Sequence, residues 1–152
     1  MKIKIAIDGP AASGKSTTAR NLAQYLGYLY IDTGAMYRAL TLAVLRNNID
    51  IHDENKIEFI ACQSRIELVQ KQNGVQTLLN GEDVSQTIRS PEINEIISIV
   101  SAYPKIRKIM VEKQRQLGKA GGIVMDGRDI GTVVLKDAEV KIFMKAELKK
   151  RA

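Results

Sequence analysis

Polar and apolar residues alternate at the start of the chain and then take up a helical spacing. The alternation over residues 2–8 is that of a strand entering a sheet. The helical stripe that follows consists of Ala19, Leu22, Ala23 and Leu26. Gly27 comes directly after this stripe and predicts the end of the helix. The chain therefore opens with a predicted strand, a turn over residues 9–16, and a helix.

Residues 28–62 predict a short strand and two helices. The strand covers residues 28–31, and a helix with one apolar stripe runs from about Ala35 to Arg46. Asp53 is a good N-cap for the helix that follows. Cys62, the only cysteine of the chain, lies in the apolar part of that helix, so we expect it to be buried.

Residues 65–84 change from helical spacing to short strand-like segments. Two of them, residues 65–72 and 75–80, flank Asn73-Gly74, which is a strong short-range hairpin signal. A short third strand is expected around Asp83-Val84. This part of the sequence predicts a small antiparallel meander.

The last third of the chain returns to helices and parallel strands. Pro91 and Pro104 each open a predicted helix. Residues 123–126 form an apolar run typical of a parallel strand covered on both faces, residues 140–144 form a last strand, and a helix is expected from Glu147. The predicted fold class is α/β, with a parallel sheet flanked by helices and a small antiparallel β/α insert.

Composition narrows the class of protein. A chain of 152 residues with 45% hydrophobic and 26% charged residues is large enough to bury a core and has an ordinary globular balance. It contains no apolar run of the roughly 18 residues that predict a membrane helix, and its first residues lack a signal-peptide segment. We therefore expect a cytoplasmic protein with no membrane partner.

The net charge of +6 raises the alternative of a nucleic-acid-binding protein. Much of the basic excess is local, over residues 105–119 and 141–151. A positive field also steers polyphosphate substrates toward an enzyme. The few aromatic residues do not interleave with the basic ones, which disfavours a surface that stacks on bases. We expect no nucleic-acid partner.

The predicted turn over residues 9–16 matches the phosphate-binding pattern G-x-x-x-x-G-K-[ST] and lies between a strand and a helix, as that loop must. Backbone N–H groups of such a loop surround phosphate oxygens, Lys15 supplies a charge for the β- and γ-phosphates, and the Ser16 hydroxyl is a Mg²⁺ ligand. The alternative is an ordinary glycine-rich turn. The candidate ATP-binding residues are Gly9, Pro10, Ala11, Ala12, Ser13, Gly14, Lys15, Ser16 and Thr17.

Two more polar clusters follow predicted strands, where ligands bind in open α/β sheets. In residues 32–38, Thr33 and Arg38 lie at the start of a helix, which suits an anion; a helix cap with a solvated arginine is the alternative. In residues 126–129, Asp126 can hold Mg²⁺ through water and Arg128 can reach a phosphoryl group; a plain turn is the alternative.

Together these segments resemble the bacterial cytidylate (CMP) kinases, members of the P-loop nucleoside monophosphate kinases. The resemblance extends from residue 1 to residue 152 and rests on G-P-A-A-S-G-K-S, D-T-G-A-M-Y-R, N-G-E-D-V and D-G-R-D-I-G-T-V-V. The second and fourth segments are far more specific than the phosphate loop. The resemblance implies one kinase domain over residues 1–152, with a core of residues 1–62 and 99–152 and a monophosphate-binding insert at about 63–98.

The resemblance also implies the reaction, in which ATP with Mg²⁺ phosphorylates CMP or dCMP. Lys15 and Arg128 would be catalytic. By family analogy, Thr33, Arg38 and Arg128 would contact the monophosphate, and Ser98, Arg107 and Asp129 would recognise the cytosine. Members of the family are generally monomers.

The family pattern continues past residue 152 with a lid, a further strand and terminal helices, none of which this sequence contains. If these 152 residues were the whole molecule, we would expect feeble turnover or none. Two alternatives stay open at this point: a kinase, and a non-catalytic nucleotide-binding fragment.

Overall fold

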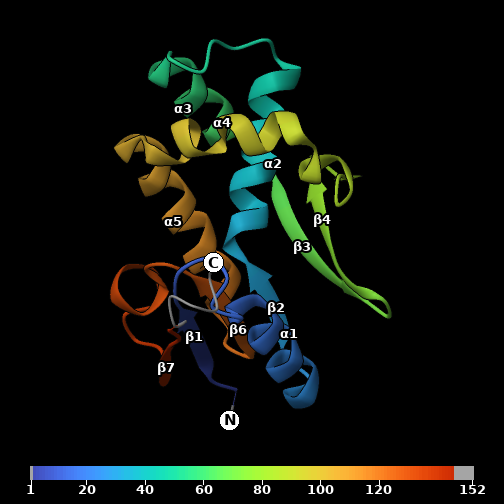
Figure 1. Ribbon diagram of the computed structural model, residues 1–152, viewed down its shortest axis with the longest axis vertical. Helices are drawn as coiled ribbons and strands as arrows, with labels where there is room; N and C mark the ends of the chain where they lie inside the picture. The colour runs from blue at the N-terminus through green and yellow to red at the C-terminus, as the bar shows by residue number, and fades with distance from the viewer. Residues whose placement is uncertain (1, 146–152) are drawn as a thin grey trace. The chain divides into compact units, whose positions relative to one another are not determined.

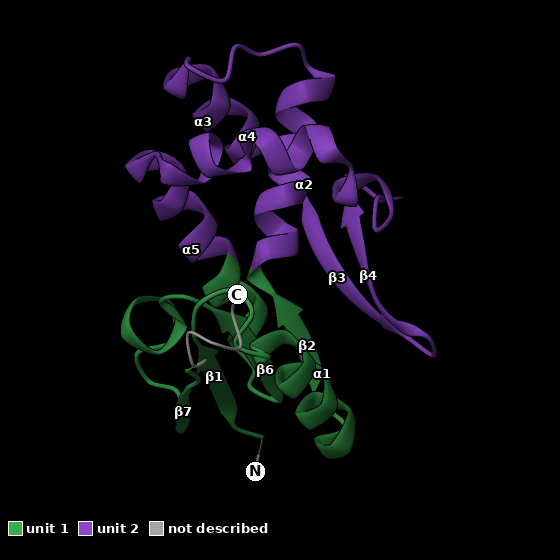
Figure 2. Ribbon diagram, in the orientation of Figure 1, with its two compact units in different colours: residues 1–33, 114–152 green, residues 34–113 purple. Residues whose placement is uncertain are grey.

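The computed structural model describes residues 2–145, so the helix predicted from Glu147 lies outside the described residues. The chain divides into two compact units, residues 1–33 with 114–152 and residues 34–113 (Figure 2). The division predicted from the family resemblance, a core and an insert at about 63–98, stays a prediction.

The first unit is built on a four-stranded parallel sheet in the order β2-β6-β1-β7. Its strands are β1 (Lys4–Asp8), β2 (Leu29–Asp32), β6 (Ile123–Gly127) and β7 (Val140–Phe143). All five residues of β6 are buried, as the apolar run predicted. Because every pair in the sheet is parallel, the carboxyl ends of β1, β2 and β6 meet at one edge, with Asp8 opposite Gly127 and Asp32 opposite Asp126.

Helix α1 (Lys15–Leu26) packs against β2 and β6 in this unit (Figure 1). Its buried residues, Ala19 and Ala23, are small and belong to the predicted stripe. Gly27 ends the helix in the left-handed conformation, with φ 70° and its N–H bonded to the last carbonyls, which confirms the predicted stop. A single π-helical turn, η2 (Ile130–Val134), follows β6 and was not predicted.

The second unit contains four helices and a small antiparallel sheet. The helices are α2 (Thr33–Arg46), α3 (Glu54–Gln63), α4 (Pro91–Ala102) and α5 (Pro104–Gly118), with a short 3₁₀ helix η1 (Thr87–Arg89) before α4. The unit boundaries fall at the start of α2 and within α5. Helix α2 begins two residues before the predicted start. The predicted cap of α3 is confirmed, since the Asp53 carboxylate accepts a hydrogen bond from the Lys56 N–H at 3.1 Å.

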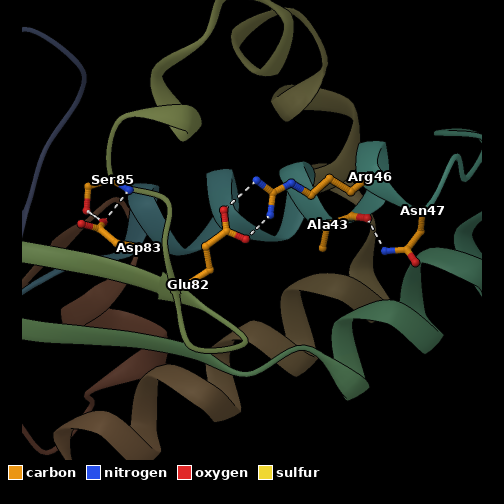
Figure 3. A network of polar contacts seen from close by, with 6 residues as sticks. All are labelled: Ala43, Arg46, Asn47, Glu82, Asp83 and Ser85. Carbon is orange, nitrogen blue, oxygen red and sulfur yellow. Dashed lines mark hydrogen bonds and ion pairs between the residues drawn. The ribbon is translucent and has the colours of Figure 1, made fainter.

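The predicted meander is the sheet β3-β4-β5, formed by β3 (Ile66–Lys71), β4 (Gly74–Leu79) and β5 (Glu82–Asp83). Lys71 pairs with Gly74, so the two-residue hairpin loop consists of Gln72 and Asn73, one residue before the predicted turn at Asn73-Gly74, and Gly74 is the first residue of β4. Figure 3 shows how β5 joins the end of α2: the Arg46 guanidinium donates to both Glu82 carboxylate oxygens at 2.8 and 3.0 Å.

The expectation that Cys62 is buried is wrong, because its side chain is exposed. The buried face of α3 consists of Ile57 and Ala61, four residues apart, and position 62 is turned about 100° away from residue 61 around the helix axis. Within residues 2–145, the helices are too short or too polar for one of them to span a bilayer.

Candidate functional site

The phosphate-loop pattern folds into a turn with an uncapped helix start. Gly14 is the N-cap of α1 in the left-handed conformation, with φ 84°, and no side chain caps the helix. The first N–H groups of a helix have no intrahelical partner and carry the positive end of its dipole. Lys15, Ser16 and Thr17 form the first turn, so this end of α1 is suited to an anion.

Two further features of the loop fit a bound phosphate. Ala12 adopts φ 64°, an uncommon conformation for a residue with a Cβ and a form of strain that gathers at functional sites. The Ser13 Oγ is buried without a hydrogen-bond partner, a property it shares among the described residues only with the Gln114 Nε2. A buried hydroxyl without a partner is costly, and phosphate oxygens would accept its hydrogen bond.

The loop is held closely against the end of β7. A Cβ at Gly9 would lie 2.6 Å from the Met144 carbonyl oxygen, so only glycine fits there. The Met144 N–H donates to the Asp8 carbonyl at 2.8 Å, and the Gly9 N–H donates to the Gly127 carbonyl at 3.2 Å. These contacts fix the loop entry relative to strands on both sides of β1.

A buried carboxylate lies beside the loop. Asp126, next to the last residue of β6, is 2% exposed and accepts a 2.8 Å hydrogen bond from the Tyr30 hydroxyl, and the Ser16 hydroxyl lies near enough to favour its charged form. Burial, together with the negative charge of Asp32, raises the pKa of Asp126 to about 6, against the opposing effect of the Tyr30 and Ser16 hydroxyls and of the Lys15 charge. Burial and the same two carboxylates raise the pKa of Tyr30.

Thr33 is also hydrogen-bonded near the carboxyl end of β6. Its hydroxyl donates to the Asp126 carbonyl oxygen at 2.8 Å and is buried. A Cβ at Gly127 would lie 2.8 Å from that hydroxyl, so the two residues are in close contact. The structure therefore brings Thr33 beside the segment that continues into Arg128 and Asp129.

Arg128 and Asp129 connect β6 to η2. The Arg128 side chain is exposed, and Asp129 is the N-cap of η2, with its carbonyl accepting from the N–H groups of Val133 and Val134. The Asp8 carboxylate accepts from the N–H groups of Ile130 and Gly131 at 2.7 and 2.9 Å. The segment after β6 is thus bonded to the residue that precedes the phosphate loop.

The other predicted acceptor residues lie in the second unit. Arg38 on α2 hydrogen-bonds through its guanidinium to the Asn94 side-chain oxygen of α4. Asn94 and Ser98 are four residues apart and so share one face of α4. Ser98 and Arg107 are exposed, on α4 and α5. The structure thus places Arg38 beside the face of α4 that carries Ser98.

Sequence reasoning missed four residues of these clusters, namely Asp8, Tyr30, Asp32 and Asn94. Asp8 and Asp32 carried a usable signal, since each is an acidic residue at the end of a strand that leads into a predicted site. The described residues contain no group of three or more histidine, cysteine or acidic side chains that could hold a metal. A divalent cation would therefore need the hydroxyl of Ser16 or oxygens of a ligand besides the carboxylates.

Comparison with known proteins agrees with the motifs. The cytidylate kinase family model matches residues 5–152. Cytidylate kinases of Caldanaerobacter subterraneus and Bacillus cytotoxicus are each 54% identical, over 100% and 99% of this chain, and that of Bacillus subtilis is 51% identical over 99%. The chain spans about two thirds of the length of these relatives, 66 to 67%. The crystal structure of TT1252 from Thermus thermophilus aligns at 20% identity with a TM-score of 0.42, over 99% of this chain and 69% of that chain.

Proposed function

This chain belongs to the cytidylate kinase family, and we propose that it provides the phosphate loop and the acceptor-binding residues of an enzyme that transfers the γ-phosphoryl group of ATP to CMP or dCMP. The products are ADP and CDP or dCDP. The observation that carries the proposal is the uncapped start of α1, with Lys15 and Ser16 in its first turn and the buried Asp126 carboxylate beside them.

ATP binding follows from the donors in the loop. The free N–H groups at the start of α1 and the Ser13 hydroxyl are donors without described partners, and phosphate oxygens are acceptors. Lys15 adds a positive charge in the first turn. These groups favour the anionic triphosphate, and they are arranged before it binds, which lowers the cost of ordering them.

Ser16 and Asp126 fit Mg²⁺. Both offer oxygen, the ligand that Mg²⁺ prefers, and both also suit a hydrated ion that keeps several of its waters. The raised pKa of Asp126 reflects a buried negative charge near that of Asp32, and a cation would relieve it. When bound, Mg²⁺ would neutralise charge on the phosphates and help to orient them.

The CMP site is proposed from the family and from chemistry. Thr33, Arg38 and Arg128 would bind the monophosphate, for which guanidinium groups give paired hydrogen bonds. Asp129 would accept from the cytosine amino group, and Arg107 would donate toward its ring acceptors, with Ser98 beside them. Uracil carries a carbonyl in place of that amino group, which would leave Asp129 facing another acceptor.

Phosphoryl transfer depends more on the positioning of the reacting groups and the neutralisation of their charge than on a covalent nucleophile. The attacking oxygen of CMP is already anionic near neutral pH, so no strong general base is required. Lys15 would stabilise charge on the phosphoryl oxygens, and Arg128 would do so from the acceptor side. The hydrogen bond from Tyr30 would hold Asp126 in place.

We also propose that the protein acts in the cytoplasm as a monomer on small nucleotides, with no nucleic-acid partner. This rests on the family and on the substrates, which are soluble metabolites. Phe143 is the one aromatic residue of the sequence within the two basic stretches, which supports the absence of a nucleic-acid partner.

An ADP-release assay with CMP, UMP and AMP as acceptors tests the proposed function. We expect release with CMP or dCMP and much less with UMP or AMP. Equal release with all three would contradict the proposed base contacts. Absence of release, together with ATP binding, would leave a nucleotide-binding chain without the transferase activity.

A further inference from the structure

The carboxylate of Asp8 connects two segments that are distant in the sequence. It accepts hydrogen bonds from the N–H groups of Ile130 and Gly131, at 2.7 and 2.9 Å, across separations of 122 and 123 residues. Asp8 is 8% exposed, and residues 130 and 131 are buried. Two charge-assisted hydrogen bonds in a buried place are strong interactions, and each fixes a direction as well as a distance.

Both ends of this contact adjoin functional segments. Asp8 is the last residue of β1, and the phosphate loop begins at the next residue. Ile130 and Gly131 come directly after Arg128 and Asp129. The contact therefore fixes the distance between the start of the phosphate loop and the segment that carries the proposed acceptor contacts.

The position leaves little freedom for that segment. Gly131 is so close to Asp8 that a Cβ there would lie 3.3 Å from the Asp8 carboxylate oxygen and 3.2 Å from a Lys141 carbon. The Asp8 carbonyl is itself bonded to the Met144 N–H at 2.8 Å. The side chain and the backbone of Asp8 thus hold two different segments of the unit against the end of β1.

We propose that Asp8 is a positioning residue, which fixes Arg128 and Asp129 beside the phosphate loop and thereby sets the affinity for the nucleoside monophosphate. This inference rests on the proposed function. It predicts a split: loss of the Asp8 carboxylate weakens CMP binding and leaves ATP binding nearly unchanged. The ATP donors, which are the N–H groups of the loop, Ser13 and Lys15, make no described contact with that carboxylate.

Two variants disturb the contact from its two ends. Asp8→Asn keeps the size of the side chain, but its amide has one oxygen acceptor, and its NH₂ group faces the second N–H. Gly131→Ala adds the close Cβ and pushes the other end by a few tenths of an ångström. Asp53→Asn is the matched control, because it makes the same change in a carboxylate that accepts from the backbone N–H of Lys56, at the N-cap of α3.

Calorimetric titration of each folded variant with CMP, and separately with ATP, tests the proposal. For Asp8→Asn we expect the Kd for CMP to rise about tenfold, the effect of one lost hydrogen bond, and the Kd for ATP to stay within about twofold. Gly131→Ala should shift the CMP Kd in the same direction by less, and Asp53→Asn should shift neither.

The possible outcomes distinguish failure of the positioning role from failure of the proposed function. Unchanged CMP affinity in Asp8→Asn, or equal loss of ATP and CMP affinity, would overturn the positioning role. If Asp8→Asn does not fold, Gly131→Ala decides, and an unchanged CMP Kd there would overturn the role as well. Wild-type protein that binds neither nucleotide would instead contradict the proposed function.

Discussion

The Tyr30 hydroxyl donates a 2.8 Å hydrogen bond to the buried carboxylate of Asp126 and so connects β2 to the carboxyl end of the neighbouring parallel strand β6. The bond connects a phenol to a carboxylate whose pKa is raised by burial and by Asp32. It holds that carboxylate beside Ser16 and the start of α1. The site and the stability of the sheet therefore share one buried interaction.

Removal of this hydroxyl should be costly. In Tyr30→Phe the Asp126 carboxylate loses a donor, so we expect the free energy of unfolding to fall by about 1 to 3 kcal/mol and the pKa of Asp126 to rise further. Urea unfolding measures the first change. The control is Tyr25→Phe, since Tyr25 is 87% exposed and should tolerate the same change. Equal stability of both variants and wild type would show that the bond contributes nothing.

The charge of Asp126 makes stability depend on pH in the absence of divalent cations. Its pKa is about 6 in the folded protein and 3.8 for the ordinary group, so between these values the folded state binds more protons than the unfolded state. Stability from this group is therefore highest below about pH 4, falls as pH rises to about 6, and stays lower above that.

The variant Asp126→Asn removes this dependence. We expect the free energy of unfolding of the variant, relative to that of the wild type, to increase by up to about 3 kcal/mol as pH rises from about 4 to 7. Urea unfolding at several pH values with a chelator present measures the gain. Parallel pH curves for the two proteins would contradict the raised pKa.

Base selection should depend on Asp129. The Asp129→Asn variant can donate as well as accept at the position proposed to face the base, so we expect the preference for CMP over UMP, measured as a ratio of kcat/KM values, to fall by about tenfold or more. The control is Asp137→Asn, an exposed carboxylate paired with Lys4. A preference that survives in Asp129→Asn would place cytosine recognition elsewhere.

The ion pair between Arg46 and Glu82, in Figure 3, should matter little despite its two good hydrogen bonds. Both side chains are substantially exposed, at 42% and 56%, so water and salt screen their charges. We expect Glu82→Gln to change the free energy of unfolding very little, and the difference to shrink in high salt. A larger, salt-independent loss would mean that the pair supports the packing of β5.

Local signals predicted most of the secondary structure. Gly27, Asp53 and Asn73-Gly74 act on their immediate neighbours through backbone conformation and capping, so their effects can be predicted from short windows. The exposure of Cys62 could not be predicted in this way, because an apolar stretch of sequence in α3 does not indicate which of its residues faces the core.

The contacts of the candidate site join residues that are far apart in the sequence, so short sequence windows could not predict them. The phosphate loop could be found from its own residues, whereas Tyr30 and Asp126 meet across 96 residues and Asp8 meets Ile130 across 122. Pairing of parallel strands creates these contacts, and a single sequence does not show which strands are neighbours. The turn η2 was missed for a similar reason, since Asp8 bonds to two of its N–H groups from outside the segment.

Calorimetric titration of ATP, in the presence of Mg²⁺, into the wild-type chain and into Lys15→Ala tests the central claim most directly. We expect the wild type to bind ATP and the variant to bind it far more weakly and to lose nearly all turnover, while both still bind CMP. The loop would then be the triphosphate site. A folded wild-type chain that binds no ATP, or a Lys15→Ala variant that binds it equally well and retains most of its kcat, would contradict the account.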